Sequence, residues 1–368
     1  MEDPDKPFLL DHASSLVDVG LDVTVVCPMT PGAPRRQVLN GVVIHRVRYA
    51  PRRLETLAAT GSMYREARGI KALLALPMLI SMFVTALRSA RGSKHRTVVY
   101  GHWWVPGGLV AVLVSRCVKS PSVVHLHGSD AFIVQNAPLR TLARMVLRKA
   151  DERLAVSSEL ADWGSELCNK PVEVLSMPLI VDRSLKPTPV PEDGFVLAVG
   201  RLVDEKGFDV LIEALGSLPQ HRRPEVVIVG VGPNRQALLE QATKAEVSLH
   251  LPGAVAPSEL AIWYRRARIV AVPSRREGFG LVAAEAAAAG RAVVGTSVGA
   301  IPQIIESESS GLIVQPDDVE AFATALDKVD PQWGVNGPQR VAHLDPVIHG
   351  QFVRQLCDDL YAHRTRFA

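Results

Sequence analysis

The sequence predicts an α/β protein made of two doubly wound, Rossmann-like domains. Its 368 residues exceed what one compact core holds and suit two domains. Short β-branched runs alternate with helical stretches along the chain, which is the pattern of parallel sheets covered on both faces. Met177 to Gly194 contains four prolines, disfavours both helix and central strand, and is predicted to be the interdomain linker.

The strands expected in the first half are Asp22 to Cys27, Val42 to Arg46, Thr97 to Tyr100, Ser122 to Leu126, Arg153 to Val156 and Val172 to Val174. Those expected in the second half are Gly194 to Val199, Glu225 to Val229, Val247 to Leu251, Arg268 to Val272, Ala292 to Thr296 and Gly311 to Val314. Asp330 to Asp345 is expected to be loose, and Pro346 to His363 to be a helix. The predicted domains are therefore 1–180 and 181–345, followed by a C-terminal helical segment at 346–368.

The first domain begins in an unusual way. Phe8 to Val19 predicts a helix closed by Gly20, and the next element is already a strand. The first strand of a doubly wound sheet is normally central, yet none precedes this helix. We therefore expect an N-terminal domain that lacks its first strand, and a natural product that begins upstream of Met1 or a truncated chain.

Composition excludes several classes of protein. The chain is 47% hydrophobic and 21% charged, which is not the composition of a disordered protein. The four cysteines form no C-x-x-C pair and no histidine stands at metal-ligand spacing, so we expect neither a disulfide framework nor a metal site. The acidic N-terminus lacks a signal peptide, which favours the cytoplasm. No motif indicates nucleic-acid binding or a cofactor.

Residues 52–96 form a basic segment, with nine Lys or Arg against Glu55 and Glu66. Within it, Ala72 to Leu87 runs for 16 residues without a charge, which is shorter than the ~20 that cross a bilayer, and Pro77 interrupts it. The preferred interpretation is a helix with its apolar side in the core and a solvated basic rim. The alternative is peripheral docking on anionic lipid at the inner face of the membrane, or on an anionic acceptor.

The segment Ser274 to Gly290 has the most specific pattern. Gly278 and Gly280 let the backbone approach a ligand, and the Ala-rich helix that follows offers free N–H groups to a diphosphate. Glu277 and Glu285, eight apart, would repel that diphosphate and are better placed to accept hydrogen bonds from hydroxyls on either side of it. A sugar diphospho-nucleoside has this layout.

A second motif follows the first strand of the second domain. Arg201 and Lys206, in a Gly-rich loop that ends at Gly207, can place two cations on one diphosphate. In the first domain, His127 and Asp130 follow a strand end, whereas His125 on the same strand is expected to be structural.

Another strand of the first domain ends in a loop that carries His102, Trp103 and Trp104. The two indoles can stack on sugar faces, although aromatic residues in loops are as often packing residues. We take these three residues and Asp130 as candidates for the acceptor side.

The stretch E-G-F-G-L-x-x-x-E, from Glu277 to Glu285, resembles the donor-site motif of the retaining glycosyltransferase family 4. The resemblance implies the GT-B fold, in which two Rossmann-like domains face across a cleft and the last helix often crosses back to the first domain. It covers nearly the whole chain from Phe8 onward, but the family's first strand and its Gly-rich loop have no counterpart.

By this resemblance, Glu277 contacts the hydroxyls of the transferred sugar and Glu285 contacts the ribose. Arg201 and Lys206 neutralise the leaving diphosphate, and His127, in H-G-x-D, faces the donor sugar. The remaining donor-site residues implied are Gly278, Phe279, Gly280 and Leu281 through their amides, and Val255 in the base-binding turn.

The expected reaction transfers a sugar from a nucleotide diphosphate to an acceptor hydroxyl with retention, by front-face attack. No D-x-D triplet is present among these motifs, so we expect metal-independent transfer. Two alternatives remain open: a non-catalytic nucleotide-sugar binder or inactive fragment, and a sugar-nucleotide epimerase. The sequence identifies neither the acceptor nor the donor's sugar and base.

Overall fold

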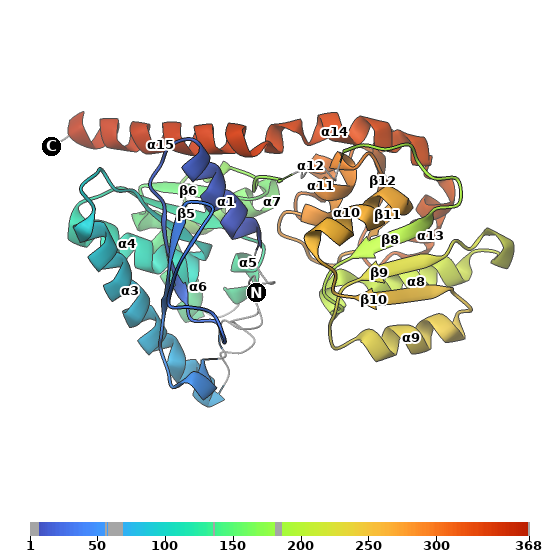
Figure 1. Cartoon of the computed structure of the whole chain (residues 1–368), viewed down its shortest axis with the longest axis horizontal. Coiled ribbons are helices and arrows are strands. Elements are labelled where there is room, and N and C mark those ends of the chain that lie inside the picture. Colours follow the sequence, from blue (N-terminus) through green and yellow to red (C-terminus); the bar gives the residue numbers. More distant parts are fainter. Residues whose placement is uncertain (1–6, 56, 58–68, 135–136, 181–185, 367–368) are drawn as a thin grey trace. The chain divides into compact units, whose positions relative to one another are not determined.

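The computed structural model describes residues 7–55, 57, 69–134, 137–180 and 186–366 (Figure 1). The chain divides into two compact units. Unit 1 comprises residues 1–178 and 346–368, and unit 2 comprises residues 179–345. The boundary after Pro178 lies inside the Pro-rich stretch, and the closing helix belongs to unit 1.

Unit 2 contains one parallel sheet of six strands in the order β10-β9-β8-β11-β12-β13. The strands are β8 (Phe195–Val199), β9 (Val226–Val229), β10 (Leu249–Gly253), β11 (Ala267–Val272), β12 (Ala292–Thr296) and β13 (Gly311–Val314). All six were expected from the sequence. Because β8 comes first in the chain but lies in the centre, the strand order reverses between β8 and β11, which is where doubly wound sheets bind ligands.

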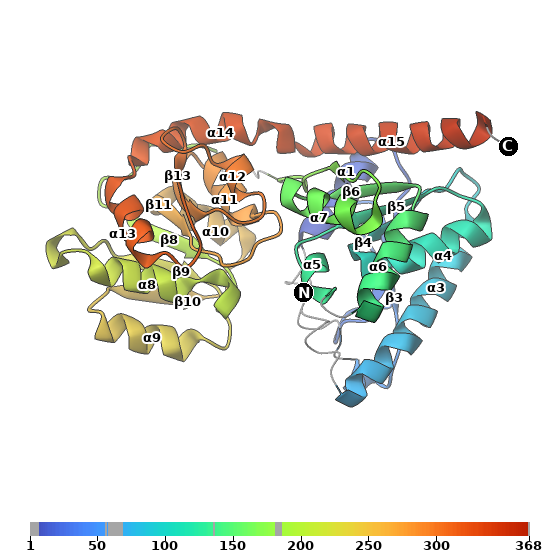
Figure 2. The ribbon, with the colours of Figure 1, turned by 180° about the vertical axis from the view of Figure 1, so that it is seen from behind.

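Helices cover both faces of this sheet (Figure 2). One face carries α8 (Phe208–Ser217), α9 (Arg235–Lys244) and α13 (Val319–Lys328), and the other α10 (Pro257–Arg266), α11 (Leu281–Ala288) and α12 (Ile301–Ile304). Leu197 and Val270 on the central strands consequently have no exposed surface. The stretch Asp330 to Asp345, which was expected to be loose, forms short helices instead, namely η7 (Pro331–Asn336), α14 (Gly337–Arg340) and η8 (Ala342–Leu344).

Unit 1 contains two sheets. Four parallel strands form the first: β4 (Val99–His102), β5 (Ser122–Leu126), β6 (Glu152–Ala155) and β7 (Glu173–Val174). The second has the order β1-β3-β2, with β1 (Thr24–Pro28) parallel and β2 (Arg36–Leu39) antiparallel to β3 (Val42–Val47). Among the described residues the two sheets share no strand pairing, and α1 (Pro7–Asp18) is the first described element.

Strand β2 was not expected from the sequence. It pairs with β3 through a two-residue turn, since Leu39 lies opposite Val42. The turn residues Asn40 and Gly41 both have positive φ, at 48° and 77°. An Asn-Gly pair between short apolar runs is a strong hairpin pattern, so the information was present in the sequence.

The described part of unit 1 also contains the helices α3 (Ala75–Gly92), α4 (Leu109–Val118), α5 (Asp130–Ile133), α6 (Ala137–Lys149) and α7 (Ser158–Cys168), and the short helices η1 (Arg52–Leu54), η2 (Gly69–Leu74) and η3 (Trp103–Gly108). The closing helix α15 (Pro346–Arg366) lies against α1 (Figure 1). Gly350 permits this approach, because a Cβ there would stand 2.3 Å from the carbonyl oxygen of Ser15. Beside it, His12 Nδ1 and His349 Nε2 are 2.8 Å apart.

Candidate functional site

The predicted donor-side residues of unit 2 gather at the carboxyl edge of its sheet. Strands β8 and β11 are neighbours, so the Arg201 loop (Gly200–Gly207) after β8 and the Glu277 loop (Ser274–Gly280) after β11 emerge side by side. Lys206 Nζ lies 2.6 Å from Glu277 Oε2. The structure thus joins two motifs that are 71 residues apart in the chain.

The Glu277 loop is held by further bonds. Ser274, which is buried, donates its hydroxyl to Glu277 Oε2 at 3.2 Å. Arg275 donates to both carboxylate oxygens of Asp209, at 2.8 and 2.6 Å, and its backbone N–H donates to the carbonyl of Glu205 at 2.9 Å. Burial raises the pKa of Asp209, but its hydrogen bonds and the charge of Arg275 outweigh this and lower the pKa overall. Arg275 was not predicted, although it adjoins the motif.

Glycines let these loops approach the neighbouring backbone. Gly207 has φ +62°, and a Cβ there would stand 2.0 Å from the carbonyl oxygen of Pro273. Gly280, at φ +89°, is the N-cap of α11. Gly299, which sequence reasoning missed, lies against the Glu277 loop, and a Cβ there would stand 2.6 Å from the carbonyl oxygen of Glu277. The loops therefore require backbone shapes that side chains would block.

Glu285 projects from α11 and is partly buried. Tyr264, which has no exposed surface, donates its hydroxyl to Glu285 Oε2 at 2.7 Å. Burial, together with the charge of Glu285, raises the pKa of Tyr264 well above its ordinary value, so the phenol stays a donor. Nothing in the sequence indicated Tyr264, because it lies on α10, outside the motif.

The other donor-side candidates differ in exposure. Arg201 is exposed, whereas Gly278, Leu281 and Val255 are partly buried. The side chain of Phe279 packs into unit 2, with 7% of its surface exposed. The contribution predicted for this residue is made by its backbone amide and does not need an exposed side chain.

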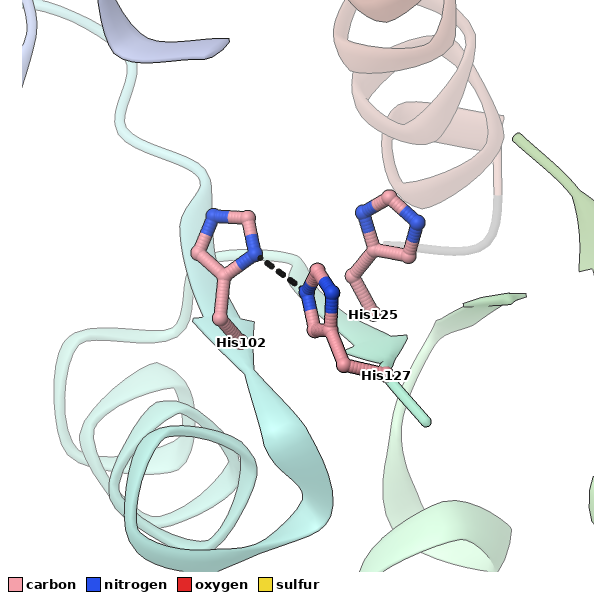
Figure 3. Close-up of side chains that lie close together, drawn as sticks. All are labelled: His102, His125 and His127. Carbon is pink, nitrogen blue, oxygen red and sulfur yellow. Dashed lines mark hydrogen bonds between the residues drawn. The ribbon is translucent and has the colours of Figure 1, made fainter. Parts of the chain in front are cut away.

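Three histidines of unit 1 lie on one face at the carboxyl ends of β4 and β5 (Figure 3). His102 is the register partner of His125, and His127 follows two residues later, so the pleat directs all three to the same side. His102 Nδ1 and His127 Nε2 are 3.0 Å apart. His125 Nε2 donates to the carbonyl of Leu175 at 2.9 Å and its Nδ1 accepts from the Tyr100 hydroxyl at 2.8 Å.

This grouping of histidines was not anticipated from the sequence. One ring nitrogen from each of His102, His125 and His127 lies within 4.8 Å of the others, which is a spacing at which three side chains could share a metal ion. The H-x-H pattern at the end of a strand could have revealed the pair His125 and His127. Burial lowers the pKa of His125 to about 3, and this ring is therefore neutral at physiological pH.

Two acceptor-side candidates also need correction. Trp104 and Asp130 are both fully buried, so neither has surface to offer an acceptor. Asp130 instead accepts backbone N–H groups of His127 at 2.7 Å and of Trp104 at 3.0 Å. Burial raises its pKa to about 8, although both of these bonds lower it. Through these two bonds Asp130 holds the loop after β5, which carries His127, to the loop after β4, which carries Trp104.

His102 and Trp103 are partly exposed, unlike Trp104 and Asp130. The ring of Trp103 stands 4.8 Å from that of His127, and the ring of Phe8 stands 5.7 Å from it on another side. The structure therefore brings His102, Trp103 and His127 together at one edge of unit 1.

Two family models match most of the chain. "Glycosyl transferase 4-like domain" matches residues 7–179 and "Glycosyl transferases group 1" matches residues 183–330. D-inositol 3-phosphate glycosyltransferase 1 of Catenulispora acidiphila is 29% identical over 359 residues, which cover 87% of this chain and 80% of the relative. An uncharacterized glycosyltransferase of Methanocaldococcus jannaschii, MJ1178, is 26% identical over 252 residues, covering 66% of this chain and 69% of the relative.

Solved structures show the same fold. Sucrose-phosphate synthase from Thermosynechococcus elongatus superposes with a TM-score of 0.78 at 19% identity. The superposition covers 97% of this chain and 93% of the synthase chain. HepE of Anabaena, solved with UDP-glucose, superposes with a TM-score of 0.65 at 17% identity and 87% coverage of both chains.

Proposed function

Because the chain belongs to the group 1 glycosyl transferases, we propose that it moves a sugar from a nucleoside-diphosphate sugar to an acceptor hydroxyl, with retention at the anomeric carbon. One observation carries this proposal: the ion pair of 2.6 Å between Lys206 and Glu277. It brings a cation for a diphosphate and a carboxylate for sugar hydroxyls to the position where a doubly wound sheet binds its ligand.

In this proposal, donor binding rearranges the ion pair. The side chains of Lys206 and Glu277 retain 21% and 16% of their exposure, so the ammonium can turn to a diphosphate oxygen. Glu277 is then released to accept from sugar hydroxyls while Ser274 still orients it. Arg201 and the first amides of α11 would share the charge of the leaving diphosphate.

Glu285, oriented by Tyr264, is proposed to accept from the ribose hydroxyls. The family motifs assign Val255 to the base and His127 to the transferred sugar, and both roles stay proposals. No side chain of the predicted set is an evident nucleophile. We therefore favour front-face attack, in which the departing diphosphate accepts the proton of the acceptor hydroxyl and the protein supplies charge and position.

Calorimetry with UDP, GDP and ADP tests donor binding on the full chain. The expected result is binding of one of them, weakened at least tenfold by Lys206→Met, since a charge-assisted hydrogen bond is worth about 1.5–3 kcal/mol. Lys244→Met, an exposed lysine at the end of α9, is the control and should bind like the unaltered chain. Absence of binding by all three nucleotides contradicts the donor site.

Turnover separates the remaining alternatives. Incubation with a donor and acceptor panel, followed by mass spectrometry, distinguishes addition of a hexose from isomerisation of the donor by an epimerase. Nucleotide binding without either product would favour the non-catalytic binder. We also propose that transfer needs no divalent ion, because Arg201 and Lys206 neutralise the leaving group. Loss of turnover on adding a chelator, restored by Mg²⁺ or Mn²⁺, contradicts this.

We further propose peripheral membrane contact through the basic segment 52–96. Helix Ala72–Gly92 is long and apolar enough to cross a bilayer, with a mean hydropathy of 1.7, but Met78 and Met82 pack into the core of unit 1. This side of the helix agrees with the preferred interpretation from the sequence, namely a helix whose apolar side lies in the core. The other side exposes Leu73, Leu76 and Ile80 at 73, 65 and 53%.

Exposed basic residues accompany these apolar side chains within the described part of the segment, namely Arg52, Arg53, Arg88, Arg91, Lys94 and Arg96. Arg65 and Arg68 lie outside the described residues. Apolar side chains flanked by cations suit the surface of an anionic bilayer. We expect co-sedimentation with phosphatidylglycerol vesicles, loss of it in Leu73→Glu/Leu76→Glu, and no loss in the control Val335→Glu, an exposed valine of unit 2. Equal sedimentation of all three proteins contradicts the contact.

A further inference from the structure

The proposed sugar contact uses only His127, but two more histidines, His102 and His125, lie beside it in unit 1. His102, His125 and His127 each direct a ring nitrogen to a common region, with these atoms within 4.8 Å of one another (Figure 3). His125 has no exposed surface and His127 has 6%. We propose that these three side chains form a binding site for a borderline divalent transition-metal ion of the Zn²⁺, Co²⁺ or Ni²⁺ class.

The distance between two of the three nitrogens is close to what such an ion needs. Two metal–nitrogen bonds of about 2.0–2.1 Å at a tetrahedral angle place the nitrogens about 3.4 Å apart. His102 Nδ1 and His127 Nε2 are 3.0 Å apart and need to separate by only a few tenths of an ångström. The nitrogen of His125 lies within 4.8 Å of the other two and must approach them to complete three protein ligands. A fourth position then remains for water, which is the pattern of an open zinc site.

The hydrogen bonds of His125 determine which nitrogen would bind the metal. The carbonyl of Leu175 can only accept, so His125 Nε2 carries the proton and Nδ1 has the lone pair. A metal-ligating histidine commonly donates its other N–H to a backbone carbonyl in this way. The hydroxyl of Tyr100, which now donates to Nδ1 at 2.8 Å, would turn away to free the lone pair.

Metal binding also rearranges the bond between His102 and His127. One of the two nitrogens now carries the proton of this hydrogen bond. To ligate, that ring moves the proton to its other nitrogen, so both imidazoles stay neutral and no net proton is lost. The chemistry of the set then selects the ion, because three imidazole nitrogens without a carboxylate suit Zn²⁺, Co²⁺ and Ni²⁺ and not Mg²⁺ or Ca²⁺.

The surroundings support a bound cation. The rings of Trp103 and Phe8 stand 4.8 and 5.7 Å from the His127 ring and form an apolar wall that limits water access. The buried carboxyl of Asp130 accepts the backbone N–H of His127 at 2.7 Å and so holds in place the strand end that carries this ring. One consequence rests on the proposed function: an ion on His127 would withdraw this side chain from the sugar, so Zn²⁺ would inhibit transfer.

The test is titration of the full chain with Co²⁺ after treatment with a chelator, followed by visible absorption. We expect one Co²⁺ per chain with the intense bands of low-coordinate cobalt, displacement by Zn²⁺ and no displacement by Mg²⁺. His102→Gln and His127→Gln should each weaken Co²⁺ binding at least about 100-fold, since even the loss of an outer-shell partner costs 10- to 100-fold. The control His250→Gln changes an exposed histidine of unit 2 and should bind like the unaltered chain.

Absence of these bands in the folded, unaltered protein overturns the proposal, as does loss of binding in His250→Gln. If a cluster variant fails to fold, X-ray absorption on the Zn²⁺ complex of the unaltered chain decides instead. Three imidazole ligands support the site, and fewer than three overturn it. UDP, GDP and ADP calorimetry on the same sample keeps the outcome separate from the donor site, which uses residues of unit 2.

Discussion

Replacing Gly207 by alanine tests the packing of the Arg201 loop against β11. Gly207 has φ +62°, a conformation that costs an alanine about 1–2 kcal/mol. A Cβ there would also stand 2.0 Å from the carbonyl oxygen of Pro273, far inside van der Waals contact. Relieving this overlap must shift the end of a buried strand, and such overpacking costs about 1–3 kcal/mol. Gly207→Ala should therefore lower the free energy of unfolding by about 2–5 kcal/mol.

Gly253→Ala is the matched control for this prediction. Gly253 lies at the end of β10 in the same unit and also has positive φ, at +91°, but nothing lies within 4 Å of the Cβ that would be added. It should therefore cost only the conformational part, about 1–2 kcal/mol. The assay is urea unfolding of the full chain, followed by circular dichroism and compared at equal m-values. Equal losses in the two variants would refute the argument that the carbonyl of Pro273 dictates glycine at 207.

Three further changes are informative. Tyr264→Phe keeps the buried ring but removes the hydrogen bond to Glu285, so calorimetry should show the affinity for the preferred nucleotide falling about tenfold with little change in melting temperature. Trp104→Ala should cost about 3–5 kcal/mol in urea unfolding because the side chain is fully buried, whereas Trp103→Ala, partly exposed, should cost clearly less. Burial raises the pKa of Asp11 to about 6, so its carboxyl favours the folded state below about pH 4 and loses that contribution as pH rises to 6. Asp11→Asn should consequently gain about 1 kcal/mol over the unaltered chain between pH 4 and 7, a value discounted for its partial exposure, and a constant difference across this range would contradict the assignment.

The secondary structure was largely predictable because it depends on local pattern. β-branched runs such as Val226 to Val229 are buried on both faces of a parallel sheet and contain no polar break. The hairpin of β2 and β3 was not predicted, although the pair Asn40 and Gly41 is a typical hairpin turn. The reason is that the strand Arg36 to Leu39 is short and only partly apolar. The Arg201 and Glu277 loops were found because their glycines and charges occur in short, recognisable spacings.

The burial and the contacts of the candidate site residues were less predictable. Trp104 and Asp130 looked available to an acceptor because polar and aromatic residues in loops usually face solvent, yet both are buried and hold the loops together. Tyr264 lies outside every motif and reaches Glu285 only because α10 packs beside α11 on one face of the sheet.

The sequence by itself determined the fold class, the order of the strands along the chain and the identity of the charged loops, because these follow from periodicity and from glycine spacing. Only the tertiary structure decided that Lys206 reaches Glu277 and that His102 stands beside His127. In both cases, parallel neighbouring strands bring together loops that are far apart in the chain. The physical reason is that register and strand order, which no local pattern encodes, determine which carboxyl ends meet.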